Sequence, residues 1–299
     1  MTDPHLSEVM SERRQLLNLA YRLLGSLAEA EDVVQETYAR WYAMSEQRRA
    51  EVTTPGAWLT TVAGRICLDL LGSARARRER YVGEWIPEPV PGRSDFFGGT
   101  ASSDPADRVT LDESISMAFL VVLESMTPAE RVAFVLHDVF RYSFAEIAEV
   151  VGRTPAACRQ LASSARRRID TSPRPPETAR AEVVRNFKRA WEAGDIEGLV
   201  GLLDPTAIAT ADSGGLVPAF REPLVGSSEI ATAWIHIATR LSTVVLVERM
   251  VNGQLGLVAE ADGKVISVYS FDIVDDRISR IWVMRNPEKL RAWTGAADQ

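Results

Sequence analysis

The sequence is poor in the residues that build disulfide frameworks, metal sites and membrane anchors. Its 299 residues include two cysteines, Cys67 and Cys158, and three histidines. Two cysteines cannot form a disulfide framework or a four-ligand zinc site, and this usage fits a reducing, cytoplasmic compartment. The longest apolar runs, such as 117–123 and 132–136, are much shorter than the roughly 20 residues of a membrane span. The first residues are acidic and polar, so we expect no secretory signal and no membrane partner.

Lysine is also scarce. The chain has three lysines, Lys188, Lys264 and Lys289, so every positive residue before position 180 is an arginine. The formal net charge of −7 argues, as an average, against a nucleic-acid-binding protein. The average hides two clusters, because residues 153–169 carry five arginines and no acid, and residues 65–80 carry five arginines and two acids. Two cationic faces in an acidic body predict selective rather than indiscriminate binding to DNA.

Proline-rich stretches divide the chain. Residues 86–107 contain four of the 15 prolines, and the run TSPRPPE occupies 171–177. Such stretches are typical of extended linkers, and the length fits two or three domains. We therefore predict a first helical domain at 8–81, a flexible connector at 82–107, a second helical domain at 108–170, a Pro-rich linker at 171–177 and a C-terminal domain at 178–292.

The first helical domain shows helix starts and apolar faces. Apolar residues between 16 and 24 recur at helical spacing and end at Gly25. Ser26 and Glu29 form a capping-box pattern that starts a second helix. Thr54-Pro55 is typical of a third start, and that helix runs into the arginine cluster of residues 65–80.

The second helical domain has the spacing of a helix-turn-helix. Capping-box patterns start at Thr127 and Ser143, Gly152 suits the turn, and Thr154 suits the N-cap of a helix over 155–169. That last helix carries the second arginine cluster. Arginine and glutamine can pair bidentately with purines, so its exposed side chains are candidates for base contacts, although a solvated arginine-rich face is the alternative.

The sequence of the C-terminal domain predicts helices followed by strands. We expect helices at 178–193, 195–203 and around 227–241, and strands around 206–212, 216–222, 243–251, 254–261, 264–274 and 277–285. Asn252-Gly253 and Asp262-Gly263 are strong hairpin signals. The predicted fold class is therefore multidomain: two all-α domains followed by an α+β cone with a curved antiparallel sheet.

Several motifs make the chain recognisable. Residues 10–80 resemble region 2 of the extracytoplasmic-function sigma factors of bacterial RNA polymerase, through AYRLLG at 20–25, AEDVVQE at 30–36 and PGAWL at 55–59. Residues 108–170 resemble region 4, through LESMTPAER at 123–131 and FAEIAEVVG at 144–152. The third segment resembles a SnoaL/NTF2-like domain, and the whole chain is similar to the sigma-factor group that carries such a domain at its C-terminus. WIPEP at 85–89 and NPEKL at 286–290 resemble signatures of that group.

The resemblance implies a transcription initiation factor with no catalytic residue and no cofactor. Its partners would be promoter DNA and the β′ clamp and β flap of core RNA polymerase. The residues implied at the β′ clamp are Asp32, Gln35 and Glu36, which share one helix face and are, by themselves, also typical of a solvated acidic face. The residues implied at the −10 element are Trp58, Arg65, Arg75, Arg77, Arg78 and Arg80. The residues implied at the −35 element are Arg153, Thr154, Arg159, Gln160, Ser163, Ser164, Arg166 and Arg167.

Two of these residues carry alternatives. Trp58 fits a core position as well as a DNA contact. Arg65 stands where most of the family has Asn, so the way in which the −10 bases are recognised differs from the family pattern.

The resemblance also implies that the C-terminal domain is an intramolecular regulator of the two DNA-binding domains, with a small-molecule ligand in its cone as an option. The residues assigned to this regulation are Trp85, Pro87, Glu88, Pro89, Asp212, Gly214, Gly215, Asn286 and Pro287. The local pattern of residues 212–215 is, more simply, that of a hairpin tip.

The sequence is also compatible with two other functions. One is an isomerase-like enzyme that uses Asp212, His236 or Asp272 as acid–base groups, although chain order shows no convergence. The other is a one-component repressor, which would have no use for the motif at 30–36. His137-Asp138 has no partner at metal-ligand spacing, so we assign no metal.

Overall fold

The computed structural model describes residues 4–78, 81–92, 115–169, 175–240 and 244–294. Its chain divides into two compact units. The helical unit comprises Met1–Glu79, Phe97–Ser114 and Phe119–Asp170, and the C-terminal unit comprises Arg80–Phe96, Ile115–Ala118 and Thr171–Gln299. The described part of the predicted connector, residues 82–92, therefore groups with the C-terminal domain, whereas residues 93–107 of the connector and 171–174 of the linker lie outside the described residues.

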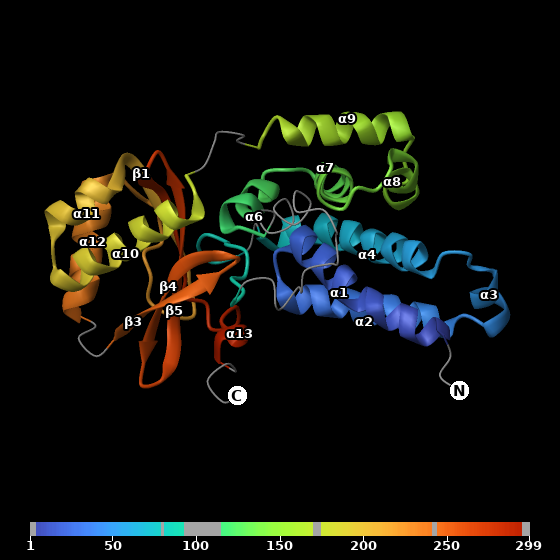
Figure 1. Ribbon diagram of the computed structural model, residues 1–299, viewed down its shortest axis with the longest axis horizontal. Coiled ribbons are helices and arrows are strands. Elements are labelled where there is room, and N and C mark those ends of the chain that lie inside the picture. The colour runs from blue at the N-terminus through green and yellow to red at the C-terminus, as the bar shows by residue number, and fades with distance from the viewer. Residues whose placement is uncertain (1–3, 79–80, 93–114, 170–174, 241–243, 295–299) are drawn as a thin grey trace. The chain divides into compact units, whose positions relative to one another are not determined.

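The first helical domain contains α1 (Pro4–Leu24), α2 (Leu27–Ala43), α3 (Glu46–Glu51) and α4 (Pro55–Arg78) (Figure 1). Gly25 ends α1 in the left-handed region at φ 69°, and the hydroxyl of Ser26 accepts the backbone N–H of Glu29 at 3.3 Å. Helices α1, α2 and α4 pack on one another. The two predicted helix starts, after Ser26 and after Thr54, are confirmed, as is the predicted end of α1 at Gly25.

The second helical domain contains α6 (Met117–Glu124), α7 (Pro128–Phe134), the π-helix η1 (Val135–Val139), α8 (Phe144–Val151) and α9 (Pro155–Arg166). Both predicted capping boxes form, at Thr127 and at Ser143. Gly152 lies at φ 68° between α8 and α9, and Thr154 accepts the N–H of Ala157 at the start of α9. The helix-turn-helix is confirmed.

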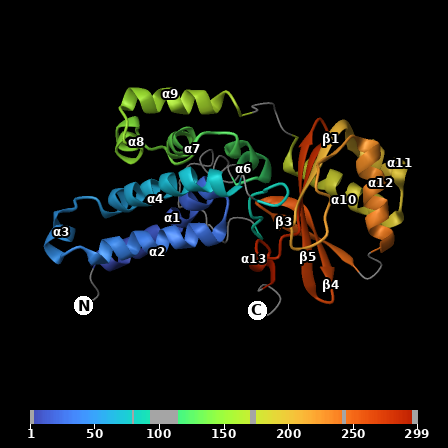
Figure 2. The ribbon, with the colours of Figure 1, turned by 180° about the vertical axis from the view of Figure 1, so that it is seen from behind.

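The C-terminal domain combines helices with one six-stranded sheet. Its elements are α10 (Glu177–Ala193), α11 (Ile196–Leu202), β1 (Leu203–Asp212), β2 (Leu224–Val225), α12 (Ser227–Arg240), β3 (Val245–Val251), β4 (Gln254–Ala261), β5 (Lys264–Val274), β6 (Arg277–Met284) and α13 (Arg291–Thr294). The strand order is β2-β1-β6-β5-β4-β3, and Figure 2 shows α10, α11 and α12 on the same side of this sheet.

The α+β architecture is as predicted, with two differences in detail. The sheet is mixed, because β1 runs parallel to β6 with Ala209 opposite Ile281. Turn residues specify only strands that follow each other in sequence, and β1 and β6 are far apart in the chain. The strand predicted at 216–222 is wrong, since β2 is limited to two residues. Pro218 and Pro223 lack the N–H that a strand donates to its neighbour.

Both faces of the sheet are buried. Phe187, Trp191 and Trp234 cover one face, where they pack on Tyr269 and Phe271. Alternate strand residues point to the opposite face, and four of these, Val258, Val268, Trp282 and Met284, are also at most 5% exposed. This second face is therefore covered by other parts of the chain.

Candidate functional site

Residues 81–92, here called the docked segment, bind the C-terminal domain. The side chains of residues 86–90 are all buried. Pro91 pairs with Val251 in an antiparallel bridge, and the N–H of Gly92 donates to the carbonyl of Met250 at 2.9 Å. Prolines favour this extended backbone and are tolerated at a sheet edge, where their missing N–H breaks no ladder. The proline-rich sequence thus forms an ordered strand-like segment on the domain.

Asp212 is the centre of this contact. It ends β1, and its carboxylate is completely buried. Oδ1 accepts the hydroxyl of Tyr81 at 2.6 Å and the N–H of Gly214 at 3.1 Å. Oδ2 accepts the N–H of Ile86 at 2.9 Å and the ammonium of Lys289 at 2.7 Å. A buried carboxylate requires such compensation, and the interpretation of residues 212–215 as a plain hairpin tip accounts only for the bond to Gly214.

Lys289 and Asn286 complete the network from the C-terminal end of the domain. The ammonium of Lys289 also donates to the carbonyl of Ile86 at 2.7 Å and lies 4.1 Å from the ring centroid of Trp85. The side-chain amide of Asn286 donates to the Tyr81 hydroxyl at 2.7 Å. Burial and the neighbouring carboxylate of Asp212 raise the pKa of Tyr81, so its hydroxyl stays a proton donor to that carboxylate. The two motifs singled out in the sequence, 85–89 and 286–290, therefore meet at Asp212.

Glycine is required where the loop after β1 approaches its neighbours. Gly214 and Gly215 have φ values of 59° and 71°. A Cβ atom on Gly214 would lie 2.6 Å from Nδ2 of Asn286, and one on Gly215 would lie 2.8 Å from Val82. The backbone conformation favours glycine at both positions, and a side chain there would have to displace Asn286 or Val82.

A second anchor was missed by the sequence reasoning. Asn252, in the turn between β3 and β4, accepts the N–H of Val90 at 3.1 Å and donates to the carbonyl of Ile115 at 2.8 Å. The indole of Trp293 in α13 donates to the carbonyl of Pro89 at 2.8 Å. The Asn252-Gly253 signal indicated only a hairpin, whereas the motif at 286–290 already included Lys289 without indicating what it binds. Asn252 thus binds chain segments on both sides of residues 93–114.

The acidic residues of α2 lie on the outside of the first helical domain. Asp32, Gln35 and Glu36 are exposed, whereas Val33 and Val34 between them are buried. Glu36 forms an exposed i,i+4 ion pair with Arg40 at 2.8 Å. The shared face that the spacing predicted is therefore present and accessible in this domain.

The residues predicted at the −10 element are only partly described. Trp58 is half-buried, and its ring lies 5.2 Å from that of the buried Trp41, so it combines a core contact with an open edge. Arg65 donates to the backbone carbonyl of Glu149 through Nη2 at 2.8 Å and Nε at 3.2 Å. Arg75, Arg77 and Arg78 lie in the last turns of α4, where side chains are outside the described part, and Arg80 is outside it altogether.

The arginines on and beside α9 differ in their contacts, because Arg159 lies over the ring of Phe144 whereas Arg166 and Arg168 form ion pairs. Arg153, Arg159, Gln160 and Arg167 are exposed, Thr154 is the exposed N-cap, and Ser163 is half-buried. Arg166 instead makes a two-point ion pair with Asp138 at 2.7 and 3.1 Å, and Ser164 donates to Glu130 at 2.7 Å. The five arginines therefore overstate the charge that this helix can offer to a phosphate.

Glu130 is nearly buried beneath α9 and joins several groups. Burial raises its pKa, but the N–H of Thr127, the hydroxyls of Ser164 and Thr127, and the guanidinium of Arg168 together lower that pKa below its ordinary value. This network fixes the end of α9 on α7.

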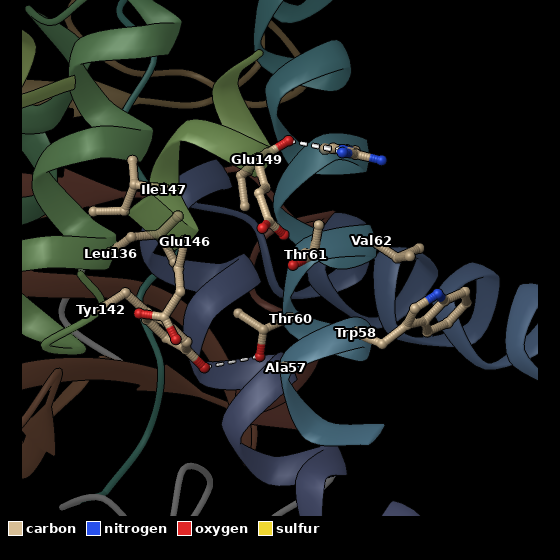
Figure 3. Close-up of a pocket in the computed structure, with 12 residues that line it drawn as sticks. Ala57, Trp58, Thr60, Thr61, Val62, Leu136, Tyr142, Glu146, Ile147 and Glu149 are labelled. Carbon is tan, nitrogen blue, oxygen red and sulfur yellow. Dashed lines mark hydrogen bonds between the residues drawn. The ribbon is translucent and has the colours of Figure 1, made fainter. Parts of the chain in front are cut away.

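A pocket of about 360 Å³ lies in the helical unit between α4 and the η1–α8 segment (Figure 3). Its walls come from both helical domains: Trp58, Thr61 and Arg65 on one side, and Tyr142 and Glu149 on the other. The pocket exists only while these two domains are in contact.

The groups considered for catalysis do not converge. Asp212 is committed to the docked segment, His236 is exposed on α12, and Asp272 lies on β5 opposite Arg280. His137 contacts the carbonyl of Tyr142. The described residues contain no group of three or more potential metal ligands. Among the described helices, none combines the length and the apolar character of a membrane span.

Comparisons with known proteins agree with this arrangement. Family models for sigma-70 region 2 and sigma-70 region 4 match residues 9–77 and 116–169. The chain is 37% identical to the ECF RNA polymerase sigma factor SigJ of Mycobacterium tuberculosis, over 95% of this chain and 93% of that protein. It is 35% identical to the probable ECF RNA polymerase sigma factor SigI of the same species, over 96% and 95% of the two chains. The crystal structure of SigJ matches with a TM-score of 0.74 and 36% identity, and the match covers 96% of this chain and 98% of that one.

Proposed function

Since the chain belongs to the extracytoplasmic-function sigma factors of RNA polymerase, and so binds core polymerase and promoter DNA rather than catalysing a reaction, we propose that its C-terminal domain regulates initiation from within. The domain does so by binding the connector between the two DNA-binding domains. The observation that supports this proposal is the buried carboxylate of Asp212, which accepts bonds from two residues of the docked segment, Tyr81 and Ile86.

The reach of the connector supports this regulation. The −10 and −35 elements are about 25 base pairs apart, which is roughly 85 Å at ~3.4 Å per pair. Residues 81–115 span up to about 110 Å when fully extended, at ~3.3 Å per residue. Asn252 binds both Val90 and Ile115, so the docked connector brings its two sides to one residue. Release of this segment gives the two DNA-binding domains the reach that a promoter needs.

The remaining contacts follow from the exposed faces. Asp32, Gln35 and Glu36 on α2 bind the β′ clamp, and the second helical domain binds the β flap. Trp58 and the arginines at the end of α4 contact the −10 element. Arg153, Arg159, Gln160 and Arg167, which are exposed on and beside α9, contact the −35 element. Thr154, Ser163, Ser164 and Arg166 contribute by positioning that helix.

The proposal also includes a cellular compartment and a ligand for the C-terminal domain. The protein acts in the cytoplasm, where the polymerase and the chromosome are. A small-molecule ligand of the cone would meet the buried indole N–H of Trp234, which finds no hydrogen-bond partner among the described residues although such groups normally have one.

The test is transcription by core polymerase with the full chain, on promoters identified by sequencing transcripts after overexpression. Asp212→Asn and Lys289→Met each weaken the network, and Asp262→Asn, on an exposed turn without a contact to the docked segment, is the matched control. We expect both network variants to change transcript yield severalfold and to speed amide hydrogen exchange at residues 86–92. Wild-type yield and wild-type exchange in both variants would show that the domain is not a regulator of this kind.

A further inference from the structure

The two helical domains approach each other closely where α4 meets α8. A Cβ atom on Gly64 would lie 2.7 Å from Cγ1 of Val150, so the helices approach to a distance that only glycine allows. The next residue, Arg65, donates two hydrogen bonds to the backbone carbonyl of Glu149, one of which is drawn in Figure 3. We call these four residues the α4–α8 contact.

The carbonyl that Arg65 binds is one that the helix leaves without an internal partner. Glu149 lies in the last turn of α8, whose final residue is Val151. The last four carbonyls of a helix lack intrahelical donors and carry the negative end of the helix dipole. A guanidinium with its several N–H groups is well suited to this position. Arg65 therefore completes the end of a helix that belongs to the other domain.

A second arginine, which belongs to the second helical domain, binds the end of a helix in the first. Arg131 of α7 donates to the carbonyl of Leu23, at the end of α1, at 2.9 Å. Arg131 is 3% exposed, and burial lowers its pKa to about 10. It also forms an ion pair with Glu124 at 2.8 Å. Arg131 is thus a buried part of the domain interface, whereas Arg65 lies at its exposed edge, beside the pocket of Figure 3.

We propose that Gly64 and Arg65 couple promoter recognition to the separation of the two helical domains, because Arg65 binds either the end of α8 or the −10 element. This inference rests on the proposed assignment of α4 to the −10 element and of α9 to the −35 element. Packed helices lie about 8–10 Å apart, and α8 packs directly on α9. The two DNA-binding faces therefore cannot span the roughly 85 Å between the elements while α4 contacts α8.

The contact makes a sharp prediction about Glu149. Its side chain is exposed, and the bond with Arg65 uses only its backbone oxygen. Glu149→Ala therefore leaves the α4–α8 contact intact, whereas Arg65→Ala removes it. An ordinary surface ion pair between the two side chains would respond equally to both substitutions.

The experiment measures the distance between the two helical domains in the full chain without DNA. Spin labels on Gln47→Cys in α3 and Ala156→Cys in α9 are read by pulsed electron resonance. Both positions are exposed, and the native Cys67 and Cys158 are buried. The variants are Arg65→Ala and Gly64→Ala. Their controls are Arg14→Ala, an exposed arginine of α1, and Gly72→Ala, a glycine of α4 at which a Cβ atom would meet nothing within 4 Å.

We expect a longer distance to appear in Arg65→Ala and Gly64→Ala, with the ratio of separated to closed chains raised about two- to fivefold, as for the loss of a solvent-exposed charged contact. Glu149→Ala and both controls should keep the wild-type distribution. Thermal unfolding of each variant establishes that it is folded before its distance is interpreted, and Arg65→Ala carries the test if Gly64→Ala does not fold.

Wild-type distances in a folded Arg65→Ala variant would overturn the inference, and so would equal opening in Glu149→Ala. The proposed function is tested separately, because it depends on Asp212 and Lys289. If Asp212→Asn alters transcription and Arg65→Ala leaves the distances unaltered, the C-terminal domain is still a regulator. The proposed coupling through Gly64 and Arg65 is then rejected. The reverse pattern would retain the coupling alone.

Discussion

Two contacts between distant segments of the chain differ in their exposure to water: the docked segment on the C-terminal domain, and α4 on α8. At Asp212 a completely buried carboxylate accepts four hydrogen bonds, one of them from the ammonium of Lys289. At the α4–α8 contact, an exposed guanidinium binds a helix carbonyl at the edge of a pocket. Removal of one partner is costly in the first case, because the other partner is left buried and unpaired. In the second case water replaces the lost partner. The comparison teaches that the α4–α8 contact can open in a folded chain more easily than the docked segment can leave its domain.

The largest effect should come from Asp212→Ala. It leaves Lys289, whose side chain is 12% exposed, without its carboxylate, and we expect a loss of about 3–5 kcal/mol in the free energy of unfolding of the C-terminal domain. Urea unfolding of the full chain, followed by hydrogen exchange in β5 and β6, measures it. A loss below about 1 kcal/mol in the free energy of unfolding would show that the Asp212 network is no more costly to break than the α4–α8 contact.

Asn252→Ala should have the next largest effect. It removes the hydrogen bonds to Val90 and Ile115, which predicts a loss of about 1–3 kcal/mol and earlier proteolysis of the docked segment. Asp262→Ala is the matched control, because Asp262 has the same left-handed backbone in the next hairpin, at φ 50° against 49° for Asn252. Equal effects of the two variants would assign the loss to backbone strain alone.

Glu130→Gln extends the comparison to a nearly buried carboxylate of the helical unit. Its pKa is lowered in the folded state, so the charged form stabilises the fold above the pKa of the unfolded chain. This contribution is lost as the pH falls through the lower folded value. We expect wild type to lose about 1–2 kcal/mol more than Glu130→Gln between neutral and strongly acidic pH. Thermal unfolding across that range measures it, and parallel pH profiles would contradict the assignment.

The smallest effect on stability should come from Asp138→Asn. The ion pair of Asp138 with Arg166 is partly exposed, so its loss should change the free energy of unfolding by less than about 1 kcal/mol. The substitution frees Arg166 for a phosphate, and the salt dependence of DNA binding should steepen by about one counterion. Titration of the holoenzyme with promoter DNA at several salt concentrations measures this. An unchanged slope would show that Arg166 does not face the DNA.

Much of the secondary structure was predictable, because it depends on neighbours in sequence. Ser26, Thr127 and Ser143 cap helices as their spacing indicated, and the turns at Asn252 and Asp262 form the expected hairpins. The two errors have different causes. The parallel pairing of β1 with β6 joins distant segments and was not encoded in any local turn, whereas the strand predicted at 216–222 ignored the local effect of Pro218 and Pro223.

The sequence by itself determined the helices, their caps, the helix-turn-helix and the motifs that identify the family, because each depends on residues within a few positions of one another. Only the tertiary structure decided what the key side chains bind. It brought Lys289 and Tyr81 to Asp212, Asn252 to the connector, and Arg65 to the end of α8. The physical reason is distance along the chain, because these partners lie 77 to 162 positions away from the groups that they bind. Asp212 needs them because a buried carboxylate requires compensation, whereas Arg65 binds a carbonyl that the end of α8 leaves without an intrahelical donor.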